Sequence, residues 1–158
     1  MAVKGEYVYE WPRAMVTVDA AVFGFFGDEV FVLLIRRGHE PFKGKWAIPG
    51  GFVEMDEELA DAAARELAEE TGLVGVELEQ IHTFGGLGRD PRGRQITVVY
   101  MGVVGEKPAG ICGGDDADDA RWFNIDRLDE IELGFDHEQV IGFAVKELGR
   151  RYPDGYCG

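Results

Sequence analysis

The alternation of hydrophobic and polar positions predicts a sheet of at least five strands. The strand segments are Val16–Phe26, Val30–Ile35, Leu73–Phe84, Gln95–Val104 and Ala120–Ile125. Gly27-Asp28-Glu29 is all that separates the first two, so we expect a tight turn between them. Trp46–Gly51, which contains Pro49-Gly50-Gly51, is expected to be a loop.

Two further segments have helical spacing. From Asp56 to Thr71 the residues are mainly Ala, Leu, Glu and Arg, which are good helix formers, and Gly72 is a typical C-terminal stop. Asp136–Arg150 predicts a terminal helix capped by the Asp136 side chain. Together the elements predict one mixed α/β domain over residues 1–158, with a sheet between a helix on each side.

The charge balance narrows the range of partners. The 158 residues include 30 Asp and Glu against 16 Lys and Arg, which gives a net charge of -14. The negative electrostatic potential of such a chain repels phosphate backbones and anionic lipids, so we expect neither nucleic acid nor a membrane as a partner. Arg151–Gly158, which follows the last predicted helix, is too short for a helix-turn-helix module. The chain has no serine, which excludes mechanisms that use a serine nucleophile.

Other features favour a cytoplasmic protein. The N-terminal segment has no apolar core of the kind found in signal peptides, and no apolar run approaches the length of a membrane span. Cys112 and Cys157 are far apart and have no His or Cys neighbours, so we expect two reduced thiols rather than a zinc site.

The candidate chemistry lies between Gly51 and Leu73. Glu66, Glu69 and Glu70 stand at i, i+3 and i+4, so on a helix all three project from one edge. An isolated glutamate-rich helix is usually a solvated face. Hard cations bind carboxylate oxygens, however, and Mg²⁺ completes its shell with water and substrate phosphates. The longer pattern, with a glycine turn before and a glycine stop after, indicates a phosphate-processing site that binds Mg²⁺ or Mn²⁺.

The segment GFVEMDEELADAAARELAEETGL resembles the Nudix box without a mismatch. This resemblance implies a Nudix-type α/β/α sandwich and divalent-metal-dependent hydrolysis of a nucleoside diphosphate linked to another group. The metal ligands that it implies are the side chains of Glu66, Glu69 and Glu70 and the carbonyl of Gly51. Glu57 and Arg65 match positions that are mainly architectural, and a salt bridge between them would brace the loop against the helix.

Hydrolysis of this kind uses an activated water and no covalent intermediate, so the absence of serine is consistent with it. A general base is also required. Glu69 and Glu70 are candidates within the box. Outside it, the acidic loop Gly113–Asp119 offers another, with Asp116 as the preferred residue, although a solvated acidic turn is the favoured interpretation for any one of these aspartates.

Segments outside the box point to a substrate. Residues 41–54, 88–94, 114–117 and 135–138 together resemble archaeal and bacterial ADP-ribose pyrophosphatases and related Nudix regulators of NAD biosynthesis. This resemblance implies hydrolysis of ADP-ribose to AMP and ribose 5-phosphate. Sugar nucleotides and nucleoside triphosphates are alternative substrates, and a non-catalytic sensor of ADP-ribose or a similar nucleotide is an alternative function. The intact set of three glutamates favours turnover.

Arginine forks bind phosphate oxygens, so four arginines are candidate substrate ligands, with surface salt bridges as the alternative. They are Arg36 and Arg37 at the end of the second strand and Arg89 and Arg92 in a glycine-rich loop. Three aromatic residues could stack on adenine or lie in the core: Phe42, Trp46 and Phe84. His137 could cap the last helix or pack beneath the site. A homodimer is possible, and the aromatic segment Tyr7–Trp11 could be exchanged between subunits or cover the domain.

Overall fold

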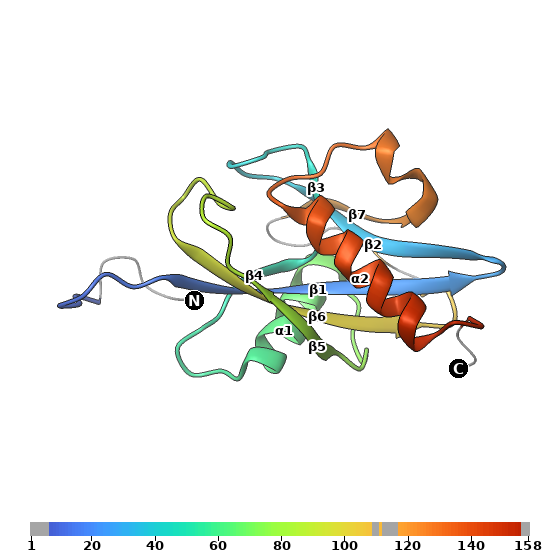
Figure 1. Ribbon diagram of the computed structural model, residues 1–158, viewed down its shortest axis with the longest axis horizontal. Helices are drawn as coiled ribbons and strands as arrows, with labels where there is room; N and C mark the ends of the chain where they lie inside the picture. Colours follow the sequence, from blue (N-terminus) through green and yellow to red (C-terminus); the bar gives the residue numbers. More distant parts are fainter. Residues whose placement is uncertain (1–6, 109–110, 112–116, 156–158) are drawn as a thin grey trace.

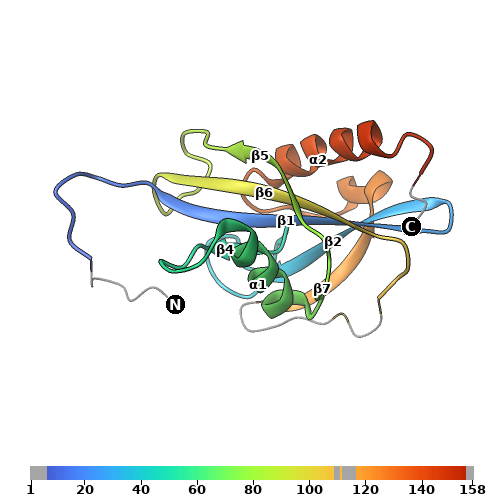
Figure 2. The ribbon, with the colours of Figure 1, turned by 90° about the horizontal axis from the view of Figure 1, so that it is seen from below.

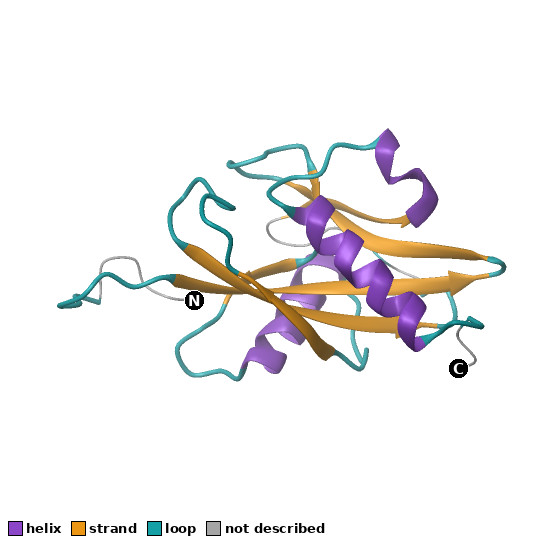
Figure 3. Ribbon diagram, in the orientation of Figure 1, coloured by secondary structure: helices purple, strands orange, loops and turns teal. Residues whose placement is uncertain are grey.

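The computed structural model describes residues 7–108, 111 and 117–155 as a mixed sheet with helices on both faces (Figures 1 and 3). The strands are β1 (Met15–Phe26), β2 (Glu29–Arg37), β3 (Trp46–Ala47), β4 (Gly50–Phe52), β5 (Glu79–Phe84), β6 (Gln95–Val104) and β7 (Ala117–Asn124). The helices are α1 (Leu59–Thr71), the 3₁₀ segment η1 (Ile125–Glu130) and α2 (His137–Arg151). Figure 2 shows α1 and α2 on opposite faces of the sheet, as the sequence predicts.

The sheet has the order β3-β2-β1-β6-β5, with β4 paired to β1 and β7 paired to β2. Its centre is the parallel pair β1 and β6, in register from Met15 with Gln95 to Gly24 with Val104. Successive side chains of a strand point to opposite faces. Val22 of β1 therefore packs in the cluster with Leu67 of α1, whereas Phe23 packs with Leu148 of α2.

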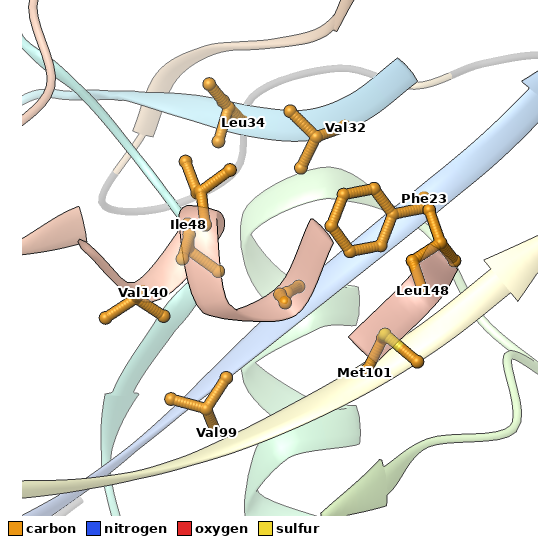
Figure 4. Close-up of a cluster of buried hydrophobic side chains, with 11 residues drawn as sticks. Phe23, Val32, Leu34, Ile48, Val99, Met101, Val140 and Leu148 are labelled. Carbon is orange, nitrogen blue, oxygen red and sulfur yellow. The ribbon is translucent and has the colours of Figure 1, made fainter. Parts of the chain in front are cut away.

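The larger core cluster lies between the sheet and α2 (Figure 4). Phe23 and Val32 come from β1 and β2, and Val99 and Met101 come from β6. Val140 and Leu148 of α2 pack against these strand residues, and all of these side chains are buried. Burial on both faces of the central strands explains why their sequences are almost continuously apolar.

Two predicted segment boundaries are wrong. Residues 73–78 precede β5 without strand pairing, and Gly75 among them has a left-handed backbone conformation (φ 74°). The predicted loop Trp46–Gly51 contains β3 and part of β4. β4 approaches β1 closely, and a Cβ at Gly50 would collide with the carbonyl oxygen of Val18. Gly50 thus allows β4 to pair closely with β1, rather than forming part of a loop.

The helix ends also differ from the sequence expectation. α1 begins at Leu59 rather than Asp56. It ends at Thr71, and the predicted stop Gly72 is its C-cap, with a left-handed backbone whose N–H donates to the carbonyl of Ala68 at 2.8 Å. Asp136 is the N-cap residue of α2, but its side chain makes no capping hydrogen bond with the described part of the chain. The predicted side-chain cap is wrong because the Asp136 carboxylate is bound to Arg89 instead.

Residues 7–14 extend away from the sheet in Figure 1, with Val8 and Trp11 largely exposed. Across the described ranges, none of the helices combines the length and apolarity needed to cross a membrane. Cys112 and Cys157, expected to be reduced thiols, lie outside the described residues.

Candidate active site

The three predicted metal-binding glutamates share one cavity with Gly51. This cavity has a volume of about 460 Å³, and its lining includes Glu66, Glu69 and Glu70 of α1 and Gly51 of β4. A Cβ at Gly51 would lie only 2.6 Å from the carboxylate carbon of Glu66. Glycine is therefore the residue that allows this carboxylate to lie against the backbone of β4.

Arg65 connects the helix to the segment before it. Its Nε and Nη2 donate to the Glu57 carboxylate at 2.9 and 2.6 Å, and Nη2 also donates to the carbonyl of Phe52 at 3.1 Å. Its Nη1 donates to Glu66 at 2.7 Å. The hydrogen bonds from Arg65 lower the pKa of Glu57 to about 2. The expected salt bridge between Glu57 and Arg65 is confirmed, and the same guanidinium also orients Glu66.

Glu70 is the most buried of the three glutamates. Its Oε2 accepts a hydrogen bond from the backbone N–H of Gly50 at 2.9 Å. Burial raises the pKa of Glu70 to about 8, and the nearby carboxylates of Glu66 and Asp19 act in the same direction. Burial also raises the pKa of Glu66, although Arg65 opposes this effect.

These carboxylates fit a hard divalent cation by their chemistry. The available donors are carboxylate and carbonyl oxygens, which Mg²⁺ and Mn²⁺ prefer. A cation would also offset the cost of ionising buried carboxylates, which is the cause of the raised pKa of Glu70. Within residues 7–108, 111 and 117–155, no group of three or more His, Cys, Asp or Glu side chains is positioned to hold a metal ion, so the three glutamates do not form a complete coordination shell. An open cradle is what Mg²⁺ uses when water and phosphate complete its shell.

Three of the four predicted arginines lie around the site. Arg37 and Arg92 line the large cavity and a smaller inner cavity, and Arg89 lines the inner one. Arg36 is exposed on β2 and lines neither of these two cavities. Arg92 lies over the rings of Phe52 and Phe135, with its guanidinium carbon 5.3 and 5.6 Å from their centroids.

The loop arginines are held by carboxylates. Arg89 is almost fully buried and donates to both oxygens of Asp136, at 2.9 and 2.6 Å. Arg92 donates to Asp90 at 2.7 Å, and the Asp90 side chain is itself buried. The Arg89–Asp136 pair therefore fixes the glycine-rich loop against the N-terminus of α2, whereas the Arg92–Asp90 pair lies within the loop itself.

The inner cavity contains polar residues that the sequence reasoning missed. Its lining includes Thr17, Asp19 and Gln95, which are buried at the ends of β1 and β6. His137 also lines this cavity, which agrees with one of the two roles considered for it, packing beneath the site. Its Nδ1 accepts a hydrogen bond from the N–H of Ile48 at 2.9 Å, and burial lowers its pKa. The sequence feature that could have identified Thr17, Asp19 and Gln95 is the presence of polar residues at alternate positions of otherwise apolar strands.

Asp116 and the three aromatic residues are the remaining candidates. Asp116 is outside the described residues. The three aromatic candidates for adenine stacking line neither described cavity and instead contact other rings: Phe42 with Phe135, Trp46 with Phe123 and Phe84 with Phe143. The aromatic residues that do line the cavities are Phe52 and Phe135.

This sandwich of sheet and helices is shared with solved Nudix proteins at a TM-score of 0.82. Residues 14–142 match the NUDIX domain model, and the chain belongs to the Nudix family. The predicted family and the predicted α/β/α sandwich are both confirmed.

Several characterised proteins are similar to this chain. It is 40% identical over 122 residues to the ADP-ribose pyrophosphatase of Methanocaldococcus jannaschii, covering 77% of this chain and 69% of that protein. It is 34% identical over 144 residues to the ADPR responsive transcriptional repressor NtrR of Acinetobacter baylyi, covering 90% of this chain and 57% of the repressor. The NUDIX domain of Shewanella oneidensis NrtR, solved as a complex with ADP ribose, is 34% identical with a TM-score of 0.82, covering 90% of this chain and 94% of that domain.

Proposed function

We propose that the chain is a divalent-metal-dependent Nudix pyrophosphohydrolase that cleaves ADP-ribose to AMP and ribose 5-phosphate. The observation that carries this proposal is one cavity that brings Glu66, Glu69 and Glu70 together with Arg37 and Arg92. Carboxylates for a cation and guanidinium groups for phosphate oxygens are the two requirements of a pyrophosphate site. The similar ADP-ribose pyrophosphatase and the similar domain solved with ADP ribose support the choice of substrate.

Glu66, Glu69, Glu70 and the Gly51 carbonyl would hold Mg²⁺, with Mn²⁺ as the alternative ion. When bound, the ion neutralises pyrophosphate charge and lowers the pKa of a water molecule. The chain itself keeps the ligands in place. Arg65 holds Glu66 through its 2.7 Å hydrogen bond, and the N–H of Gly50 holds Glu70 at 2.9 Å.

The arginines orient the substrate in this proposal. Arg37 and Arg92 face the shared part of the two cavities, where they can bind pyrophosphate oxygens, and Arg89 supports the loop that carries Arg92. Arg36 stays a weaker candidate because it is exposed outside both cavities.

A general base takes a proton from the attacking water. Glu69 has the most exposed side chain of the three glutamates, so its carboxylate can contact bulk water. Glu70 and Asp116 are the other candidates. Asp116→Asn under saturating metal tests the candidate outside the metal site, because loss of a base there lowers kcat without raising the metal concentration required for activity. Glu69→Gln and Glu70→Gln should change both quantities, since both residues are also proposed metal ligands.

A substrate panel tests the proposal. The purified chain is incubated with ADP-ribose, ADP-glucose, NADH, diadenosine polyphosphates and nucleoside triphosphates, each with Mg²⁺, Mn²⁺ or EDTA. We expect ADP-ribose to be among the best substrates, with AMP and ribose 5-phosphate as products and no turnover in EDTA. The substrate assignment fails if ADP-ribose is poorly hydrolysed while another compound is cleaved rapidly.

A sensor of ADP-ribose is the second candidate function, because the chain is 34% identical to a repressor described as ADPR responsive. This chain spans 57% of that repressor, against 69% of the pyrophosphatase. A sensor would bind ADP-ribose in calorimetry and release no AMP in Mg²⁺. A homodimer and a cytoplasmic location complete the proposal, and light scattering and cell fractionation test them.

A further inference from the structure

Four buried polar side chains interrupt the face of the sheet that packs against α2. They are Thr17 and Asp19 of β1 and Gln95 and Thr97 of β6, on strands that pair in parallel. Further along, the same rows are apolar and belong to the core cluster. Burying a polar group is unfavourable unless it finds a hydrogen-bond partner. Each of the four therefore requires a partner, or a reason for lacking one.

Only one of the four contains an unsatisfied atom. Thr97 donates its hydroxyl to Asp19 at 2.6 Å, and Thr17 donates to the carbonyl of Ile96 at 3.5 Å. Gln95 is 2% exposed, and its amide nitrogen has no hydrogen-bond partner in the described residues. A buried amide donor of this kind is uncommon in a folded protein. A bound ligand that supplies an acceptor would explain why the position is polar.

Gln95 lies where such a ligand would sit. It lines the inner cavity, which continues from the large cavity through shared residues, among them Gly51, Glu70 and Arg37. The inner cavity has a volume of only about 40 Å³, against about 460 Å³ for the large one. This space suits a small oxygen-bearing group, whereas a purine base requires the larger cavity.

The surroundings favour an oxygen acceptor. Arg37 and Arg89 line the same small space with the carboxylates of Asp19 and Glu70, and Arg89 already donates to Asp136. The guanidinium group of Arg37 can attract a phosphate or hydroxyl oxygen. The amide nitrogen of Gln95 is a donor only, so it requires an acceptor atom. Phosphate oxygens and sugar hydroxyls both provide one.

We infer that Gln95 is a ligand-binding residue that donates a hydrogen bond to an oxygen of the phospho-sugar part of the substrate. This inference rests on the proposed function, because the substrate enters from the cavity that holds the glutamates. The Gln95 amide selects for ligands that present an oxygen at the inner end of the site. Analogues without that oxygen leave the amide unpaired and bind less tightly.

The test uses Gln95→Met, which keeps the approximate length of the side chain and removes the amide. The matched control is Gln80→Met, the same replacement at an exposed position of β5. Two quantities are measured for each variant: the melting temperature without ligand, and the Kd for ADP-ribose by calorimetry in EDTA. Ribose 5-phosphate and inorganic phosphate are titrated as well, because they separate sugar hydroxyls from phosphate oxygens as the acceptor.

We expect Gln95→Met to be at least as stable as the wild type without ligand, because an unpaired donor is removed. Its Kd for ADP-ribose should rise at least about tenfold, as for loss of a hydrogen bond to a charged or buried group. A larger Kd for inorganic phosphate as well locates the contact on phosphate, and an unchanged one locates it on the sugar. Gln80→Met should match the wild type in both measurements.

Two results would overturn the inference. One is an unchanged Kd in Gln95→Met, and the other is a clear loss of stability without ligand, which would make Gln95 a structural residue. Hydrolysis is scored separately on the wild-type chain. A chain that binds ADP-ribose through Gln95 without cleaving it contradicts only the proposed hydrolysis, and an active chain with an unaffected Gln95→Met variant contradicts only this inference.

Discussion

Glu70→Gln should stabilise the metal-free protein while removing its activity. Glu70 is buried, and its pKa is raised to about 8, chiefly because burial disfavours the ionised form. Above that pH the metal-free protein must hold a buried carboxylate near Glu66 and Asp19. Glutamine has the same shape and can still accept the hydrogen bond from Gly50, but it carries no charge.

The magnitude follows from the difference between folded and unfolded proton affinities. A tenfold change in affinity corresponds to about 1.36 kcal/mol. A pKa raised from 4.5 to about 8 therefore gives an upper limit of about 5 kcal/mol for the penalty. Water entry and relaxation reduce this value, so we expect Glu70→Gln to gain about 2 to 5 kcal/mol at pH 8.5.

The pH dependence has a definite sign. Between pH 4.5 and about 8 the folded protein retains the Glu70 proton that the unfolded chain has released. The contribution of Glu70 to the free energy of unfolding therefore falls as the pH rises through this window, and the whole penalty is present above it. Near pH 4.5 the variant and the wild type should be equally stable with respect to this residue.

The assay is urea unfolding in EDTA at pH 4.5, 6.5 and 8.5, followed by melting curves with added Mg²⁺. Glu138→Gln, at an exposed position of α2, controls for the loss of one negative charge and should stay within about 0.5 kcal/mol of the wild type. Mg²⁺ should raise the melting temperature of the wild type and not that of Glu70→Gln. A variant that is less stable than the wild type at pH 8.5 would refute the reasoning.

Two other predictions concern the residues that shape the site. Arg89→Met should lower the free energy of unfolding, measured by urea denaturation, by about 3 kcal/mol, because it leaves the largely buried Asp136 without its partner. A loss below about 1 kcal/mol would show that this pair does not hold the loop. Gly51→Ala should fold with near-normal stability, because the three atoms nearest to its methyl group belong to the end of the Glu66 side chain, which can move at the cost of its hydrogen bond to Arg65. Displacing that carboxylate should lower Mg²⁺-dependent kcat/KM by up to about a hundredfold, and unchanged kinetics would count against Glu66 as a metal ligand.

The sequence predicted the parts of the fold that depend on local pattern. The β6 bounds, Gln95–Val104, agree with the prediction because a nearly continuous apolar run, typical of a strand covered on both faces, stops at Gly105. The predicted start of α1 is three residues early because Glu57 and Glu58 are good helix formers, and Glu58, the observed N-cap, makes no side-chain capping hydrogen bond that would mark this end. Gly50 was read as a loop residue because its close approach to β1 depends on a strand distant in sequence.

The candidate site was predictable where spacing within one helix sets the geometry. Glu66, Glu69 and Glu70 required only the helical repeat to be placed together. Asp136 was misread as a helix cap because its partner, Arg89, is 47 residues away and the pairing exists only in the folded chain. Gln95 is visible in the sequence as a polar residue at the start of an apolar strand, but its burial depends on residues distant in sequence, such as Thr17 and Phe135, which line the same cavity.

The central claim is metal-dependent cleavage of ADP-ribose, and its most direct test is AMP formation by the wild-type chain. Product is measured by chromatography in Mg²⁺ and in EDTA, with Glu70→Gln in Mg²⁺ as the comparison. We predict equimolar AMP and ribose 5-phosphate in Mg²⁺, none in EDTA, and a loss of most turnover in the folded variant. Turnover that persists in EDTA, or full activity in Glu70→Gln, would contradict the claim.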